Sequence, residues 1–321
     1  MKRITLAGLL ATFLVSLSSL AQDYPSRRVT LLVGYSAGGP VDVAARLLAE
    51  RLRDSLNQPV IVENRIGGGP LLSFESVKNA APDGYTLAIA TPGIVTLKFT
   101  SKAYTLDPLN DFSYIAHLTG NVYPLVLIGS TRAPYRTLAE FVSYARANPG
   151  KVSFGTAGTS VEIEIGRMAQ IGNFKVTLIP YKGSAPLQLD LAAGELGASL
   201  DGYGPSRPGI DAGKTRVLGV GSRERVPELR DVPAIGEVLP GYEVFTNWFG
   251  LIGPAGMPAE LVNRINESVG AVLRRPDLPA RLEPIGLKPA PPGSAPAFRA
   301  LVSSNYEQFG KAAALIGLQP Q

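Results

Sequence analysis

Backbone N–H groups near the start of the chain have the setting of an anion-binding site. They belong to a glycine-rich loop between an apolar run and Pro40, and the loop residues are Gly34, Tyr35, Ser36, Ala37, Gly38 and Gly39. Glycines let a backbone approach a ligand closely, and the first N–H groups of a helix lack partners within that helix. The loop therefore predicts a carboxylate or phosphate site. Glycine also serves purely steric roles in many strand-to-helix turns, so the loop alone is a weak signal.

Three polar side chains are further candidates for contact with a ligand. Asp42 falls in the first turn of the helix that begins at Pro40, where an acid stabilises the helix dipole by about 0.3–1 kcal/mol. Asp201 ends a predicted strand, and it either accepts a hydrogen bond from a ligand or caps the next helix. Thr91 follows another predicted strand. Three aromatic residues are as suited to a cleft wall as to a core: Tyr35, Tyr181 and Trp248.

Patterns typical of enzymes and metal sites are mostly missing from the sequence. It contains no GxGxxG motif, no complete P-loop motif GxxxxGK[ST] and no cysteine, and its only histidine, His117, is the one histidine base available to Ser36 in the GxSxG stretch Gly34–Gly38. We expect His117 to have a structural role, because its surroundings suit a satisfied buried ring. The sequence therefore predicts a protein that is not an enzyme and that uses neither a cofactor nor a metal.

The elements that position these residues alternate regularly between strand and helix. Val29–Val33 reads as a buried strand, and apolar residues from Val41 to Leu56 share one helical stripe. The alternation restarts near residue 123, which indicates two doubly wound α/β lobes with mostly parallel sheets and helices on both faces. We assign residues 22–122 and 247–321 to the first lobe, and residues 123–246 to the second. In such folds ligands bind beyond the carboxyl ends of the strands.

The first residues predict the compartment. Lys2 and Arg3 precede a short apolar stretch, and small residues end at Ala21, which is typical of a signal peptide covering residues 1–21. Without cysteine there is no site for a lipid anchor, so we expect a soluble periplasmic monomer. The formal net charge is +5 for the whole chain, and its basic residues are scattered. This distribution argues against a nucleic-acid partner.

Several blocks of the sequence resemble the Bug (TctC-type) receptors of tripartite tricarboxylate transporters. The resemblance covers essentially all of the mature chain, and its blocks are Val33–Asp42, Val62–Arg65, Ala81–Leu87, Pro180–Gly183, Asp231–Pro233 and Trp248–Gly256. It implies a two-lobed periplasmic receptor that closes on a small organic acid. The loop Tyr35–Gly39 would hold one carboxylate through N–H groups and water. The acid at Asp42 would orient this loop, and direct contact of Asp42 with the ligand is the alternative.

The second lobe would supply the facing loop, Gly155–Ser160, and this is where the chain departs from the family pattern. The residues expected to contact the ligand there are Thr156, Ala157, Gly158, Thr159 and Ser160. Glu162 stands where a histidine is frequent in the family. It is either a first-turn acid or a residue that faces the cleft and disfavours a second ligand carboxylate.

These expectations leave the ligand class and the partner open. A small carboxylate, an amino acid and an amide all remain candidates. The predicted mechanism is hinge closure around the ligand, followed by delivery to the membrane subunits of a transporter. The alternative is a receptor that presents its closed form to a membrane sensor kinase without transport, and an orphan scavenger is a third reading.

Overall fold

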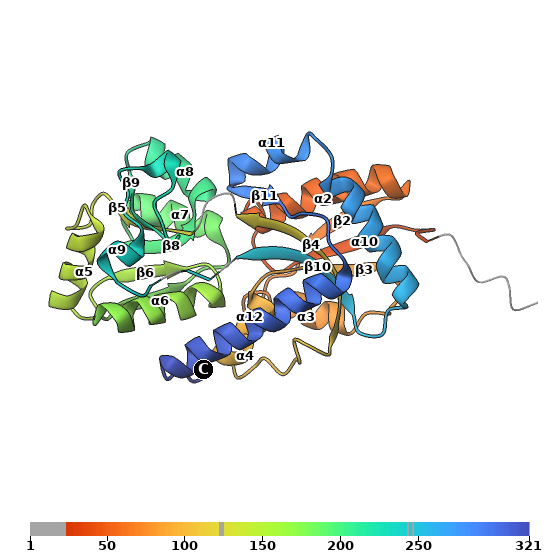
Figure 1. Ribbon diagram of the computed structural model, residues 1–321, viewed down its shortest axis with the longest axis horizontal. Coiled ribbons are helices and arrows are strands. Elements are labelled where there is room, and N and C mark those ends of the chain that lie inside the picture. Colours follow the sequence, from red (N-terminus) through yellow and green to blue (C-terminus); the bar gives the residue numbers. More distant parts are fainter. Residues whose placement is uncertain (1–23, 122–124, 243, 246, 321) are drawn as a thin grey trace, which may run out of the picture.

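Two β-sheets, each covered by helices on both faces, form two lobes that lie side by side (Figure 1). The computed structural model describes residues 24–121, 125–242, 244–245 and 247–320. The predicted signal peptide lies outside these residues. None of the helices in the part of the chain described here is long and apolar enough to cross a bilayer.

The first lobe contains a six-stranded sheet in the order β11-β4-β10-β3-β1-β2. Its strands are β1 (Val29–Val33), β2 (Val60–Asn64), β3 (Thr86–Ala90), β4 (Phe112–Asn121), β10 (Trp248–Pro254) and β11 (Leu287–Pro289). In register, Leu31 of β1 pairs with Val62 of β2 and with Leu87 of β3, both in parallel. β10 runs antiparallel to β3 and to β4, because the chain returns through it from the second lobe.

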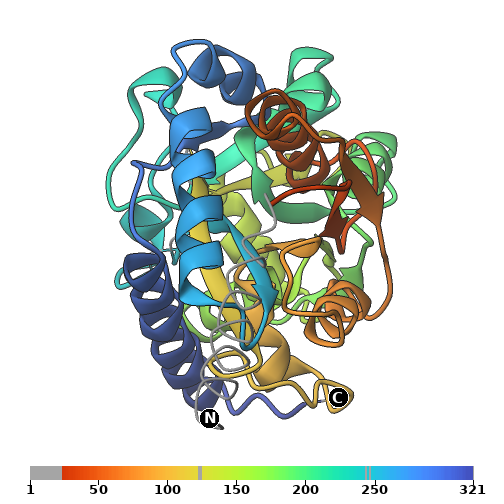
Figure 2. The same cartoon turned by 90° about the vertical axis from the view of Figure 1, so that its right-hand side faces the viewer.

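Helices cover both faces of this sheet, and each face has its own apolar core. On one face lie α2 (Pro40–Leu56), α10 (Ala259–Leu273) and α11 (Leu278–Leu282). On the other lie α3 (Leu71–Lys78), α4 (Gly93–Thr100) and α12 (Ala295–Leu315), as Figure 2 shows for the long helix α12. A short 3-10 turn, η2 (Glu283–Ile285), leads into β11.

The second lobe contains a five-stranded sheet in the order β7-β6-β8-β5-β9. Its strands are β5 (Leu125–Ser130), β6 (Ser153–Thr156), β7 (Thr177–Pro180), β8 (Ala198–Gly202) and β9 (Thr215–Val220). Its helices are α5 (Leu138–Ala147), α6 (Thr159–Gly172), α7 (Ser184–Ala193), α8 (Tyr203–Asp211) and α9 (Ile235–Val238), and a 3-10 turn, η1, spans Pro227–Leu229.

The two-lobed α/β class is confirmed, but the expectation of mostly parallel sheets is wrong. Four pairs of neighbouring strands in the described residues are parallel, and five are antiparallel. The parallel pairs come from the βαβ units β1-β2, β1-β3, β6-β7 and β6-β8. The antiparallel pairs are formed through β4, β5, β9, β10 and β11. β4 and β5 are the strands on either side of the first crossing between the lobes, β9 and β10 are on either side of the return crossing, and β11 follows it. The strands β4 and β10 were not anticipated from the sequence.

Contacts between the lobes show that the cleft is closed. The backbone N–H of Ser36 in the first lobe donates to the carbonyl of Lys182 in the second at 3.1 Å. The hydroxyl groups of Thr96 in α4 and Thr159 in α6 form another hydrogen bond. Near the far end of α6, the side-chain amide of Gln170 donates to the carbonyl of Leu315 at 3.1 Å. The structure therefore describes a closed arrangement, with the two lobes in contact.

Candidate ligand-binding site

Five helices from both lobes begin at one cavity between the lobes. Their N-cap residues carry no side chain that could bond the first N–H groups, and these residues are Gly39 of α2, Pro92 of α4, Gly158 of α6, Gly183 of α7 and Gly202 of α8. All five line the cavity. Ser, Thr, Asp or Asn would normally occupy such positions and cap the helix. In α2, α6, α7 and α8 their replacement by Gly leaves N–H donors for a ligand, whereas the first N–H groups of α4 are bonded to Thr91 and Pro92.

The glycine loop predicted from the sequence forms the first-lobe side of this cavity. Gly34 packs so closely on the next loop that a Cβ there would lie 2.5 Å from Cα of Pro70. Gly38 has φ +82°, a left-handed conformation that glycine adopts without strain. Tyr35, Ser36 and Gly39 line the cavity. The loop is therefore held in one shape by its backbone.

Asp42 holds this loop from behind and does not line the cavity. Its carboxylate accepts the N–H of Gly38 at 3.0 Å, two bonds from the guanidinium of Arg46 at 2.9 Å each, and the side-chain amide of Asn64 at 2.8 Å. The same amide of Asn64 donates to the carbonyl of Tyr35 at 3.0 Å. Burial alone would raise the pKa of Asp42, but the hydrogen bonds from Arg46, Gly38 and Asn64 hold it below its ordinary value.

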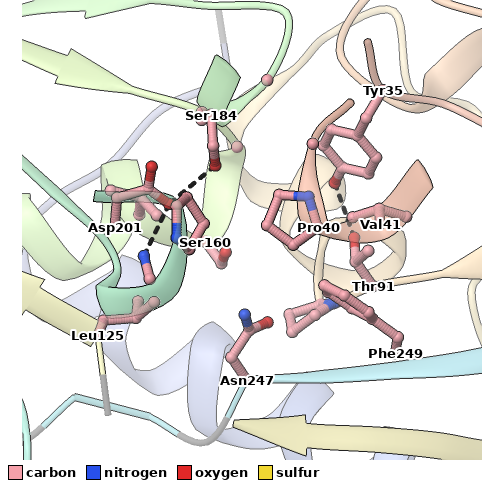
Figure 3. Close-up of a pocket in the computed structure, with 18 of the residues that line it drawn as sticks. Tyr35, Pro40, Val41, Thr91, Leu125, Ser160, Ser184, Asp201, Asn247 and Phe249 are labelled. Atoms are coloured by element: carbon pink, nitrogen blue, oxygen red, sulfur yellow. Dashed lines mark hydrogen bonds between the residues drawn. The ribbon is translucent and has the colours of Figure 1, made fainter. Parts of the chain in front are cut away.

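A buried pair of hydroxyl groups completes the first-lobe side (Figure 3). The phenol of Tyr35 and the hydroxyl of Thr91 lie 2.7 Å apart, and Thr91 also accepts the N–H of Gly93 at 3.2 Å. Burial raises the pKa of Tyr35 to about 12, so its phenol stays protonated. The hydroxyl oxygen of Ser36 is buried without a partner among the described residues.

Asp201 forms part of the second-lobe side and is buried. It accepts hydrogen bonds from the hydroxyl of Ser184 at 2.9 Å, from the amide of Gln188 at 2.9 Å and from the N–H of Gly202 at 2.8 Å. Burial raises the pKa of Asp201, although these three donors oppose that shift. Asp201 precedes the N-cap of α8 and is not itself that cap.

Glu164 is a second buried acid in the lining, and the sequence analysis did not identify it. One carboxylate oxygen accepts the N–H of Phe245 at 2.7 Å, and the other accepts from the guanidinium of Arg167 at 2.9 Å. Burial raises the pKa of Glu164 to about 7, because the loss of hydration outweighs the attraction of Arg167 and these hydrogen bonds. The sequence signal that could have pointed to Glu164 is its position in the second turn of α6, close to the helix N-terminus at the cavity.

The rest of the lining is largely apolar. Both lobes and the chain segments between them supply it, through Val41, Leu125, Val161, Val244, Phe245, Phe249, Ile285, Leu287 and Phe309. In Figure 3, Leu125, Asn247 and Phe249 lie on the side where the chain passes between the lobes. We call these apolar residues, without Val41 of α2 and Val161 of α6, the hinge-side wall. They come from distant parts of the sequence, and the sequence analysis anticipated none of them as a site residue.

The predicted site residues divide into two groups. Those that line the cavity are Tyr35, Ser36, Gly39, Thr91, Ala157, Gly158, Ser160 and Asp201. Those outside its lining are Ala37, Gly38, Asp42, Thr156, Thr159, Glu162 and Tyr181. Glu162 lies in a separate hollow beside Gln170 and Leu315, and its carboxylate accepts from the hydroxyl of Thr156 at 3.5 Å. This placement matches a first-turn acid.

Three aromatic or titratable candidates have structural partners. The phenol of Tyr181 donates to Asp190 at 2.6 Å. Trp248 is only 1% exposed, and its indole N–H donates to Asn305, so it belongs to the core. His117 bonds the carbonyl of Thr119 at 3.1 Å and stacks on Phe298. No group of three or more His, Asp or Glu residues within the described ranges is arranged to hold a metal ion.

Two α/β lobes that close on a cavity lined by helix N-termini define a solute-binding protein of the two-lobed class. Residues 44–316 match the model of the tripartite tricarboxylate transporter family receptor, TctC. The chain belongs to that family. The resemblance found in the sequence is thus confirmed.

Relatives of the chain extend over nearly its whole length. A UPF0065 protein encoded between tcbD and tcbE in Pseudomonas sp. (strain P51) is 34% identical over 97% of this chain and 93% of its own. Among solved structures, R. palustris Rpa4515 with adipate is 32% identical, with TM-score 0.86, over 93% of this chain and all of its own. MatC from Rhodopseudomonas palustris with bound malate is 28% identical, with TM-score 0.83, over 90% of this chain and all of its own.

Proposed function

We propose that this protein is a periplasmic receptor that captures a small organic acid between its lobes and delivers it to a tripartite tricarboxylate-type membrane transporter. The observation that carries the proposal is the convergence of four helix N-termini with glycine N-caps, those of α2, α6, α7 and α8, on one interlobe cavity. Among the described residues, the lining contains no Lys, Arg or His. Recognition of an anion therefore depends on N–H and hydroxyl groups rather than on a cationic side chain.

The arrangement explains how an acid is held without a cation. A carboxylate has about four acceptor sites, and charge-assisted hydrogen bonds are roughly twice as strong as neutral ones. Donors of the first lobe at the cavity include N–H groups at the start of α2 and the hydroxyls of Ser36, Tyr35 and Thr91. The second lobe adds the N-termini of α6, α7 and α8.

Hinge closure follows from the distribution of these groups. No single lobe holds all of them, so a ligand gains its full set of contacts only when the lobes meet. The bond between Ser36 N–H and the Lys182 carbonyl then joins the two loops beside the ligand. The periplasmic location is supported by the family and by the basic and apolar N-terminal residues.

The test is to identify what the protein carries and what it binds. Native mass spectrometry of the purified protein is followed by denaturation and identification of any released molecule, and the stripped protein is then titrated with a panel of organic acids and amides. We expect one acid to bind per chain with a Kd near 1 μM, which corresponds to about −8 kcal/mol. Absence of binding by every acid in the panel, with binding of an amide instead, would contradict the proposal.

Delivery to a transporter is tested in cells. Deletion of the neighbouring genes for membrane transport subunits should abolish uptake of the identified acid and leave the receptor's affinity unchanged. Uptake that persists, together with a ligand-dependent response of a membrane kinase, would instead identify a sensory receptor.

A further inference from the structure

We propose that the ligand is an acid with a single carboxylate and an apolar body, bound with its carboxylate against the first lobe and its body along the hinge-side wall. This inference rests on the proposed function of the same cavity, and it names the class of acid that the cavity favours. It differs from the two R. palustris structures, which hold adipate and malate.

The charges in the lining are unevenly distributed between the lobes. The two acidic side chains among the described lining residues, Glu164 and Asp201, come from the second lobe. The first-lobe side offers N–H and hydroxyl donors, and its one nearby acid, Asp42, lies behind the loop with its oxygens bonded to Gly38, Arg46 and Asn64. The second-lobe side also has N–H donors, at the starts of α6, α7 and α8, but there they share the lining with two carboxylates, so a ligand carboxylate is favoured on the first-lobe side.

A second carboxylate would meet a different environment on the opposite side. There it would lie near Asp201 and Glu164, whose side chains are buried and offer mainly acceptors. Arg167 pairs with Glu164 but does not line the cavity, so it offers the ligand no direct contact from the lining. Repulsion between close anions is weakly screened in such a place, and this disfavours dicarboxylates.

The hinge-side wall favours a ligand with an apolar body. Phe249 and Phe309 are both at most 5% exposed, and with Phe245 they present three aromatic rings from β10, α12 and the segment before β10. Phe245 and Phe309 pack edge to face with ring centroids 5.0 Å apart. An apolar ligand body gains free energy by leaving water against such a wall, whereas a hydroxyl or carboxylate would lose its hydration there.

Hexanoate and adipate form a matched pair of probes for this inference. They have the same six-carbon chain, and only adipate carries a second carboxylate. Isothermal titration at pH 8 is suitable because burial raises the pKa of Glu164 to about 7, so Glu164 is mostly ionised at that pH. We expect the stripped wild-type protein to bind hexanoate at least tenfold more tightly than adipate, and benzoate more tightly than malate.

A charge-removing variant then tests the cause. Glu164→Gln keeps the shape of the side chain and should reduce the preference for hexanoate over adipate at least threefold. The matched control is Glu195→Gln, which removes an exposed charge in the same lobe and should leave the preference unchanged. Circular dichroism shows whether each variant is folded.

The outcomes separate this inference from the function on which it rests. If wild-type protein binds adipate as tightly as hexanoate, or more tightly, the inference is wrong and the acid-binding function stands. If none of the four acids binds, both the inference and the proposed function are contradicted. An equal change of preference in both variants would refute the role of Glu164.

Discussion

Asp42 shows how one side chain fixes the shape of the glycine loop from outside the cavity lining. It is 2% exposed, and it joins α2, the glycine loop and β2 through Arg46, Gly38 and Asn64. The resemblance to the receptor family suggested this orienting role. The structure adds the partners that carry it out.

Replacing Asp42 therefore affects both stability and binding. We expect Asp42→Asn to lower the free energy of unfolding by about 1–3 kcal/mol, because the buried loop and the Arg46 guanidinium lose a charged acceptor. Ligand affinity should fall as well, since Gly38 is no longer held. Urea unfolding and titration measure the two effects. Asp54→Asn, an exposed position on the same helix, serves as a control and should change stability by less than about 0.5 kcal/mol.

Glu164 predicts a pH dependence of stability. Its pKa is about 7 in the folded protein against an ordinary value of 4.5, so the folded state binds more protons than the unfolded state between these values. Its contribution to stability is present below pH 4.5 and is lost as the pH rises to 7, by about 1.4 kcal/mol for each unit of pKa difference.

The measurement compares wild type with Glu164→Gln across that range. The difference between their free energies of unfolding should move in favour of the variant from pH 4.5 to 7 and then level off. His117 and Asp201 also titrate, but they are common to both proteins and drop out of the difference. A difference that does not vary with pH would contradict the raised pKa.

At the scale of elements, the helices that begin at the site share one feature. Their N-cap residues have no side chain that can cap the helix. Each of the five N-caps at the cavity is Gly or Pro, whereas Thr137 and Ser294, away from it, cap α5 and α12 with their hydroxyls. A Pro N-cap is not confined to the cavity, because Pro70 and Pro258 precede α3 and α10 elsewhere, but none of the five helix starts at the cavity has a Ser or Thr cap.

The contact between α8 and η2 predicts a variant that opposes closure. A Cβ on Gly204 of α8 would lie 2.3 Å from the carbonyl carbon of Ile285 and 2.4 Å from the nitrogen of Gly286, both backbone atoms of the other lobe. Gly204→Ala should weaken ligand binding tenfold to a hundredfold, because backbone clashes of this kind destabilise by about 1–3 kcal/mol.

Titration and thermal unfolding distinguish this effect from damage to the fold. Alanine is a better helix former than glycine, so the ligand-free variant should unfold at an unchanged or higher temperature. Gly270→Ala in α10, where the nearest atom to a Cβ lies 3.5 Å away, is the control and should bind normally. Normal affinity in Gly204→Ala would show that the lobes meet differently around the ligand.

Much of the fold could be predicted because short apolar runs bounded by Gly and Pro define β1, β2, β3 and their neighbouring helices. β10 could not, since its glycines interrupt the apolar pattern for a tertiary reason. A Cβ on Gly250 would lie 1.9 Å from the ring of Phe298 in α12. Likewise, the glycine loops revealed the polar part of the site, whereas Phe245, Ile285 and Phe309 reach the hinge-side wall only through the folding of distant segments.

At the scale of the whole molecule, ligand binding should both raise the free energy of unfolding and keep the two lobes closed. Ligand at 100 times its Kd should raise the free energy of unfolding by about 2.7 kcal/mol.

The N–H of Ser36 should exchange slowly with solvent only in the bound protein, because its acceptor, Lys182, belongs to the other lobe. Hydrogen exchange and small-angle X-ray scattering, with and without ligand, check both effects. Equal exchange at Ser36 in the two states would contradict closure.

The order of strands in the first lobe has a consequence for how the chain folds as the ribosome makes it. β10, residues 248–254, lies between β3 and β4, so the sheet keeps a gap until most of the chain has been synthesised. The five strands of the second lobe are contiguous in sequence and need no later residue to pair. The second lobe can thus form early, while the first must wait for its last strands.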